Sequence, residues 1–294
     1  MLNDLKSSSK RSQSAMEYLM TYGWSILIVA VVLGALSFLG VFNPMTFTPK
    51  ATAGGCQVIK NTELGISNLE GACNNQVPQY VAQFNGESSY ISTGTSDLPL
   101  GSNPRSVFAW IYLTGNNLRQ SIFSYGSQSS PEEIRLEVFS GNILANIYGS
   151  GESGLGIQIP EDEWILVGYV YSGSGSSITV YYNTQSSTVP ENTGPPNTIL
   201  AATDPSDIGK EQGISGSYFD GSIANLQIYN TSLTNSSIKT LYDEGIGGAP
   251  VDLQNLVGWW PLNGNANDYS GNQNNGVPTN VVFTSNWYVG YTQP

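Results

Sequence analysis

The sequence predicts a mainly β protein, in which an N-terminal hydrophobic α-helix precedes a β-sandwich of the jelly-roll type. Three observations lead to this fold class. A long run without charges follows a basic N-terminus, many short runs rich in Val, Ile, Tyr, Phe and Trp follow residue 50, and Gly, Ser, Asn and Pro separate these runs. The first pattern is typical of a hydrophobic helix, and the other two are typical of the strands and turns of a sandwich.

The predicted helix lies within residues 13–48, after a polar leader of residues 1–12. The leader carries three basic side chains and one acid, and the 19 residues from Trp24 to Phe42 carry no charge. A helix of that length spans roughly 28 Å, which is close to the thickness of a bilayer core. The basic flank predicts that the N-terminal end stays in the cytoplasm, and Pro44 ends the helix.

Residues 80–294 form the predicted sandwich. Strands are expected in the runs SVFAWIYL, IRLEVF, WILVGYVY, SITVYYN and ANLQIYN. One short helix is expected over residues 235–245, because Asn and Ser stand at its start and Gly245 at its end. The tail, residues 248–294, either closes the sandwich or begins a second repeat. Closure is favoured, because about 45 residues do not bury a core of their own.

The composition excludes several functions. Ten basic residues against 22 acidic ones give a net charge of -12, so a nucleic-acid partner is not expected. The chain has no histidine, which removes imidazole bases and histidine metal sites. Its polar surface therefore depends on hydroxyl and amide groups more than on charges.

The segment of residues 49–79 is interpreted as a linker that carries both cysteines of the chain, Cys56 and Cys73. Because they follow an export segment, a disulfide is predicted, with two free thiols as the alternative. Two Asn-x-Ser/Thr sequences predict glycosylation at Asn230 and Asn235.

The stretch KRSQSAMEYLMTYGW, residues 10–24, resembles the leader of archaeal type IV pilins. The matching residues are Arg11, the small Ser12, Gln13 and Glu17. The resemblance implies that a leader peptidase cuts between Ser12 and Gln13, and that the helix then packs into a filament core. There, Glu17 would pair with the new α-amino group of Gln13, because a buried unpaired charge costs several kcal/mol.

The stretch departs from the pilin pattern in three places: Ser12 where glycine is usual, Ala15 where serine is usual, and Thr21 where a hydrophobic residue is usual. Two alternatives therefore stay open. One is an uncleaved signal anchor, and the other is an ordinary leader cut after residues 51–53, which have the small-x-small form.

The body resembles laminin-G-like, concanavalin-A-like jelly rolls. The segments that carry the resemblance are YVAQFNGESSYIST (80–93), SVFAWIYLTG (106–115) and residues 216–245, with LVGWWPLNGNANDYSGNQNNG (256–276) also in the family's pattern. In these segments Phe84 and Phe219 are expected to fill the core. The resemblance implies a sandwich that displays a lectin-like surface.

Two groups of carboxylates are candidates for a catalytic pair. Glu161, Asp162 and Glu163 are consecutive, so they cannot share one face of a strand. Glu133 and Glu137 are an even number of residues apart, so they could share one face of a strand, but no aspartate lies between them. Both groups are predicted to be solvated charges, and no catalytic residue and no enzyme activity are expected.

A calcium ion is the one cofactor that the sequence suggests. Asp268 and Asn272 lie in a tight loop that offers hard oxygen ligands. The alternative is a turn held by hydrogen bonds between side chains and backbone.

Together these patterns predict a structural subunit of a cell-surface type IV pilus-like filament, anchored in the membrane before assembly. Its partners would be other copies of the chain through residues 13–48, the leader peptidase, and surface glycans bound by the exposed head. Tyr125, Tyr148 and Trp287 are aromatic candidates for glycan contact if they are exposed. The alternative is a membrane-anchored glycan-binding protein or glycosidase that does not polymerise.

Overall fold

The computed structural model describes residues 20, 22–38, 48–61, 64–73, 76–115, 119–149, 156–190, 194–200, 206–211 and 216–294. The chain divides into two compact units, Met1–Thr48 and Pro49–Pro294. In the first unit, residue 20 and residues 22–38 are helical. Among the described residues, no helix is both long and apolar enough to cross a membrane.

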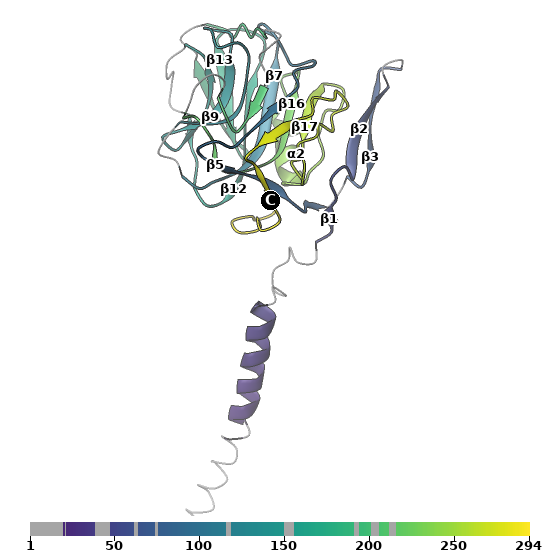
Figure 1. The fold of residues 1–294 in the computed structure, drawn as a ribbon, viewed down its shortest axis with the longest axis vertical. Coiled ribbons are helices and arrows are strands. Elements are labelled where there is room, and N and C mark those ends of the chain that lie inside the picture. The colour runs from purple at the N-terminus through teal and green to yellow at the C-terminus, as the bar shows by residue number, and fades with distance from the viewer. Residues whose placement is uncertain are drawn as a thin grey trace, which may run out of the picture. The chain divides into compact units, whose positions relative to one another are not determined.

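The second unit is a β-sandwich (Figure 1). Seven of the described strands form one sheet, here the seven-stranded sheet. In spatial order they are β11 (Ile157–Gln158), β10 (Asn142–Ile147), β9 (Ile134–Phe139), β8 (Gln120–Tyr125), β15 (Ser206–Ile208), β6 (Tyr90–Thr93) and β18 (Val277–Thr279).

Eight described strands form the opposite layer, here the eight-stranded sheet. Seven follow one another in the order β14 (Gln185–Pro190), β13 (Ser177–Tyr182), β12 (Trp164–Tyr171), β7 (Arg105–Leu113), β16 (Asp220–Tyr229), β5 (Val81–Asn85) and β19 (Val282–Thr284). The eighth, β17 (Leu256–Trp260), also pairs with β16. The tail thus contributes strands to both sheets, through β18 in one and through β17 and β19 in the other.

The core lies between the two sheets, because side chains alternate between the faces of a strand. Ile134, Leu136 and Val138 of β9 belong to this core, as do Ile165 and Val167 of β12 in the opposite layer. Phe84 and Phe219 are also buried there, with ring centroids 6.2 Å apart at an edge-to-face angle. The expected jelly-roll sandwich with these two rings in its core is therefore present.

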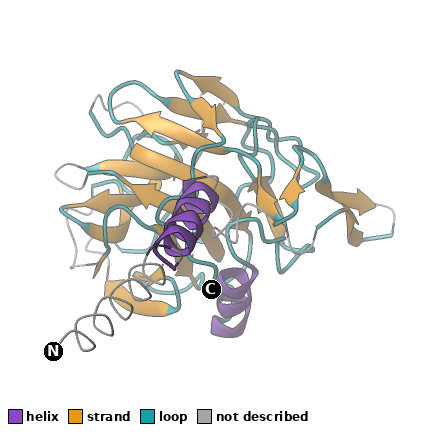
Figure 2. Ribbon diagram, turned by 90° about the horizontal axis from the view of Figure 1, so that it is seen from below, coloured by secondary structure: helices purple, strands orange, loops and turns teal. Residues whose placement is uncertain are grey.

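One helix of the second unit, α2 (Asn235–Glu244), forms where the sequence predicts it. The side chain of Thr234 caps the first turn by accepting a hydrogen bond from the Ser237 amide, and Gly245 ends the helix with φ of 76°. Ile238 and Leu241 are its buried residues. Figure 2 shows α2 beside the C-terminus, with strands and loops making up nearly all the rest of the unit.

The segment interpreted as a linker contains four strands. β1 (Lys50–Ala51) pairs in parallel with β4 (Val77–Pro78), and β2 (Cys56–Asn61) forms an antiparallel hairpin with β3 (Ile66–Gly71). The hairpin extends from the body in Figure 1. Its inner side contacts the tail, because the Val58 amide donates to the Tyr269 carbonyl at 2.8 Å.

Candidate functional site

A row of side chains crosses the outer face of the eight-stranded sheet. The strand register places Trp164 of β12 opposite Tyr112 of β7, Tyr112 opposite Ser222 of β16, and Ser222 opposite Gln83 of β5. Their neighbours along each strand point into the core: Ile165, Ile111, Ile223 and Ala82. Because of this alternation the four side chains of the row share the face that points away from the core.

An open pocket of about 260 Å³ lies over this row. Besides the row, its lining consists of Thr114, Gly221, Thr284, Asn286, Trp287 and Val289. Trp164 and Trp287 are almost buried, at 6% and 4% exposure, whereas Tyr112 is half buried and Gln83 and Asn286 are exposed. The aromatic pocket, as these residues are called below, therefore combines indole and phenol rings with hydroxyl and amide groups.

Two glycines let the backbone approach the pocket closely. Gly221 has φ of 143°, and a Cβ atom there would lie 2.0 Å from the Tyr112 carbonyl oxygen. Gly290 has φ of 75°, and a Cβ atom there would lie 2.8 Å from the Tyr112 ring and 2.4 Å from the Asp162 carbonyl oxygen. Only glycine accommodates such approaches, so the C-terminal tail can pass directly beside Tyr112.

Hydrogen bonds fix the tail as one wall of the pocket. The indole N–H of Trp164 donates to the Trp287 carbonyl at 2.9 Å, and the backbone N–H of Trp164 donates to the Gly290 carbonyl at 2.8 Å. The indole rings of Trp164 and Trp287 also pack edge to face, with centroids 5.8 Å apart. The wall is therefore part of the folded domain rather than a free end.

Aromatic contacts continue from the pocket to α2. Trp287 packs on Tyr291 with centroids 5.6 Å apart, and Tyr291 packs on Trp110 at 5.9 Å. Trp110 in turn stacks on Tyr242 of α2 at 6.0 Å. Such packing holds Trp287 in a single position, which lowers the entropy that a ligand must offset on binding.

The acidic run Glu161–Glu163 lies beside the pocket and is exposed, as predicted. The Tyr112 hydroxyl donates to Asp162 Oδ1 at 3.4 Å. Burial raises the pKa of Tyr112, and the negative charge and hydrogen bond of Asp162 raise this pKa further. The hydroxyl therefore stays protonated, and it remains a hydrogen-bond donor, at neutral pH.

The prediction that Glu133 and Glu137 are solvated is wrong, because both side chains are fully buried. Glu137 lies on the outer face of the seven-stranded sheet, where its carboxylate is 2.5 Å from the Arg119 guanidinium and accepts the Asn146 amide N–H at 3.1 Å. Arg135, on the same face, pairs with the buried Glu211. These ion pairs offset the cost of removing the carboxylates from water.

The Asp268 carboxylate is engaged by hydrogen bonds from its own loop and from strand β17. Oδ1 accepts the backbone N–H groups of Trp259 at 3.0 Å and Ser270 at 2.8 Å. Oδ2 accepts the Ser270 hydroxyl at 2.9 Å and the Asn274 backbone N–H at 2.8 Å. This arrangement is the hydrogen-bonded turn that the sequence offered as the alternative to a calcium site.

Asn272 is also engaged. Its Oδ1 accepts the Lys60 ammonium at 3.0 Å, and its Nδ2 donates to the Val257 carbonyl at 2.9 Å. A cation thus already occupies the oxygen that would serve a metal. The described residues contain no group of three or more acidic, cysteine or histidine side chains placed to hold a metal ion.

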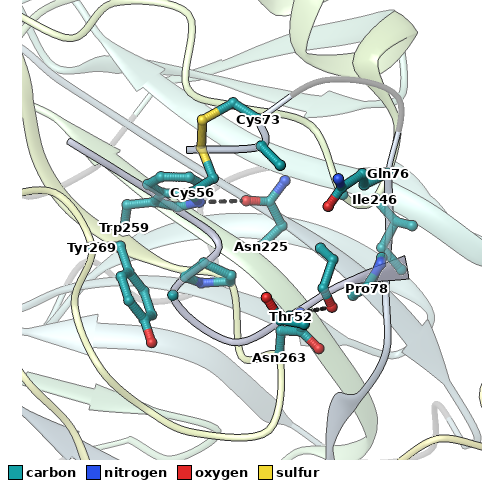
Figure 3. Close-up of a pocket in the computed structure, with 15 residues that line it drawn as sticks. Thr52, Cys56, Cys73, Gln76, Pro78, Asn225, Ile246, Trp259, Asn263 and Tyr269 are labelled. Atoms are coloured by element: carbon teal, nitrogen blue, oxygen red, sulfur yellow. Dashed lines mark hydrogen bonds between the residues drawn. A yellow bond between two sulfur atoms is a disulfide. The ribbon is translucent and has the colours of Figure 1, made fainter. Parts of the chain in front are cut away.

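A smaller pocket of about 40 Å³ lies between the disulfide-bonded segment, β16 and β17 (Figure 3). Its amide groups are already in use. Asn225 Oδ1 accepts the indole N–H of Trp259 at 2.7 Å, and Asn225 Nδ2 donates to the Gly248 carbonyl at 2.8 Å. The Asn263 amide donates to the Ala51 carbonyl at 2.8 Å. These bonds make the pocket a packing seam that joins residues 51–78 to the sandwich.

The other predicted residues fall in three groups. Cys56 and Cys73 form the predicted disulfide. Asn230 and Asn235 are exposed, and Asn235 Oδ1 accepts the Tyr181 hydroxyl at 3.0 Å. The leader and assembly residues Ser12, Gln13 and Glu17 lie outside the described residues.

Of the aromatic candidates, Tyr125 is fully buried, Tyr148 is half buried, and Trp287 lines the pocket. The sequence reasoning missed Tyr112, Trp164, Ser222 and Gln83. The available signal was the alternation along each strand, since each of the four is the immediate neighbour of a core residue and so points to the opposite face.

The comparison with family models matches residues 85–239 to the concanavalin A-like lectin/glucanases superfamily. The match covers more than half of the chain, so the protein belongs to this superfamily. No curated protein matches the chain.

Solved structures with the same fold have low sequence identity. An inferred carbohydrate-binding protein from Bacteroides ovatus has a TM-score of 0.52 and 14% identity, over 74% of this chain and 62% of that one. The heptameric SAP-like pentraxin of Limulus polyphemus has a TM-score of 0.44 and 20% identity, over 68% and 95%. The carbohydrate-binding module CBM40 of a Ruminococcus gnavus sialidase has a TM-score of 0.43 and 16% identity, over 56% and 99%. The chain thus spans less than two thirds of the Bacteroides protein.

Proposed function

We propose that residues 49–294 are a glycan-binding domain and that the aromatic pocket is its binding site. The observation that carries the proposal is the grouping of Tyr112, Trp164 and Trp287 with uncharged polar side chains around an open pocket of about 260 Å³. The fold shared with an inferred carbohydrate-binding protein supports it.

The chemistry of the lining suits a sugar. A pyranose has an apolar face of C–H groups that packs on an aromatic ring, and a rim of hydroxyl groups that need both donors and acceptors. Tyr112 offers the half-buried ring, and Gln83, Thr114 and Asn286 are exposed beside it. Their amide and hydroxyl groups both donate and accept, so they match the hydroxyls of a sugar.

A glycan array probed with the full-length chain in detergent tests the proposal. We expect wild-type protein to bind at least one oligosaccharide class, and Tyr112→Ala to lose most of this binding. Tyr148→Ala is the matched control, because Tyr148 is also half buried but directly follows β10 of the seven-stranded sheet. Binding lost in Tyr148→Ala and kept in Tyr112→Ala would place the glycan on the other sheet. An array without any bound glycan would contradict the proposed function.

Catalysis is not part of the proposal. The carboxylates with the parity of a catalytic pair are buried, and that of Glu137 is held by Arg119 at 2.5 Å. A carboxylate that is fully buried and held by a guanidinium is not within reach of a substrate. Incubation of the bound glycans with the protein, followed by mass analysis, should therefore show no shorter products.

A filament role is a second proposal, supported by the resemblance of residues 10–24 to archaeal pilin leaders. Cleavage before Gln13 would leave a new α-amino group four residues from Glu17, so that assembly would depend on their pairing. Terminal peptide mass spectrometry should find Gln13 as the first residue. Glu17→Ala should then be made and processed but accumulate as membrane-bound monomer, visible as missing filaments in electron microscopy. Abundant normal filaments from this variant would remove the pairing role, and the chain would act as an anchored binding protein.

A further inference from the structure

We infer that the aromatic pocket selects neutral glycans and disfavours glycans that carry carboxylates, such as uronic and sialic acids. The inference rests on the proposed function, and it adds the chemical class of the ligand. It follows from two features of the structure: the lining side chains carry no formal charge at neutral pH, and two of them donate hydrogen bonds to carboxylates.

The surrounding carboxylates lie close to lining residues. Asp162 accepts the Tyr112 hydroxyl at 3.4 Å, and Asp220 Oδ1 accepts the Thr114 hydroxyl at 3.1 Å. Glu161 and Glu163 flank Asp162 and are exposed. A carboxylate on a bound sugar would thus meet the negative charges of Asp162 and Asp220 at the rim of the pocket.

Positive charge near the pocket is sparse in the part of the chain that the structure describes. Lys50 lies over the Tyr288 ring, 5.0 Å from its centroid, and this ring packs on Trp287 with centroids 4.4 Å apart. The ammonium thus contacts Tyr288, which is not among the lining residues of the pocket. The net charge of the whole chain, -12, adds to the negative potential.

The negative potential does not repel neutral sugars, because they carry no charge. Their hydroxyl groups need only the amide and hydroxyl partners of the lining. For an anionic sugar, each nearby carboxylate weakens binding by about two- to fivefold at low salt, as Coulomb's law gives for two charges about 8 Å apart in a partly aqueous medium. The combined effect of Asp162 and Asp220 should be visible as a clear preference between otherwise matched ligands.

Matched ligand pairs make the test specific. We would titrate the full-length chain with neutral oligosaccharides and with the uronate oligosaccharides that share their stereochemistry: glucan and glucuronan, galactan and galacturonan, mannan and mannuronan. Each pair differs only in a hydroxymethyl group against a carboxylate. Repeating the titrations at 50 mM and 500 mM salt separates charge from shape, because salt screens exposed charges.

Asp162→Asn is the informative variant. Asp162 has φ of 59°, a conformation that asparagine tolerates well, and the amide oxygen keeps an acceptor for the Tyr112 hydroxyl. Asp97→Asn is its matched control, because Asp97 is also exposed with φ of 61° but does not line the pocket. Both variants remove one negative charge without demanding a new backbone conformation.

We expect the neutral member of the bound pair to bind more tightly than the uronate. Asp162→Asn should raise uronate affinity about two- to fivefold at low salt and leave the neutral ligand unchanged, while Asp97→Asn changes neither. Uronates that bind as tightly as the neutral sugars, or an Asp162→Asn variant with unchanged uronate affinity, would overturn the selectivity and leave the glycan-binding function intact. If no sugar of either kind binds, both the selectivity and the function are wrong.

Discussion

Replacing Asp268 by alanine should destabilise the sandwich strongly, and it should do so without any role for calcium. The carboxylate accepts four hydrogen bonds, three of them from the backbone N–H groups of Trp259, Ser270 and Asn274. A buried donor that loses its acceptor costs about 1–3 kcal/mol. Three such donors, with some relaxation, give a loss of about 3–6 kcal/mol in the free energy of unfolding.

Thermal unfolding of the full-length chain measures this loss. For a domain of this size, each kcal/mol shifts the Tm by about 2–4 °C, so Asp268→Ala should unfold about 6–24 °C below wild type. Asp243→Ala is the control: its carboxylate pairs with Lys239 at 2.6 Å on the surface of α2, and such exposed pairs contribute about 0.5 kcal/mol or less.

A chelator decides between the hydrogen-bonded turn and a calcium site. We expect EDTA to leave the wild-type Tm unchanged, since Lys60 and backbone donors occupy the oxygens of the loop. If EDTA lowers the wild-type Tm as far as Asp268→Ala does, and the variant no longer responds to EDTA, Asp268 holds a metal ion and the reasoning from hydrogen bonds is refuted.

Three further outcomes are expected. Replacing Cys56 and Cys73 together by serine should cost about 3 kcal/mol of stability, as expected for closure of a loop of about 15 residues; a melting curve equal to that of wild type would contradict it. Glu137→Gln should cost about 3 kcal/mol, since Arg119 loses its charged partner, and a denaturant titration with an unchanged midpoint would count against a structural ion pair. Burial raises the pKa of Asp207, so this carboxyl keeps its proton up to a higher pH in the folded state than in the unfolded state. The free energy of unfolding should therefore fall as the pH rises from the unfolded-state pKa through the folded-state pKa. Asp207→Asn should flatten this slope in melting curves recorded across pH.

Local patterns in the sequence were sufficient to predict most of the fold. The runs at β7 and β12 were predicted as strands because apolar and β-branched residues fill them, and both lie at the centre of the eight-stranded sheet. The capped segment became α2 because Gly245 and the polar residues before it satisfy the helix ends locally. Such features depend on neighbouring residues, which a sequence displays directly.

The aromatic pocket could not be predicted in the same way, because it depends on register. Gln83, Tyr112, Trp164 and Ser222 come from four strands that are far apart in sequence, and only pairing brings them into one row. A shift of one residue in any strand would turn its side chain into the core. Parity identifies outward positions but not which of them become neighbours.

The burial of Glu137 was missed for a related reason. Glu137 was predicted to be a solvated charge, and it does lie on the outer face of its sheet, where side chains are usually solvated. The structure adds Arg119 against it, and pairs the adjacent Arg135 with Glu211, which lies far along the chain. Ion pairs with residues far along the chain cannot be predicted from the residues of β9 alone.

A crystal structure of the protein with the neutral oligosaccharide that binds most tightly tests the central claim most directly. The account predicts a sugar ring in van der Waals contact with Tyr112, with its hydroxyl groups hydrogen-bonded to Gln83, Thr114 or Asn286 in the aromatic pocket. A sugar bound instead over Arg135 and Asn146 on the seven-stranded sheet, with the aromatic pocket empty, would contradict it.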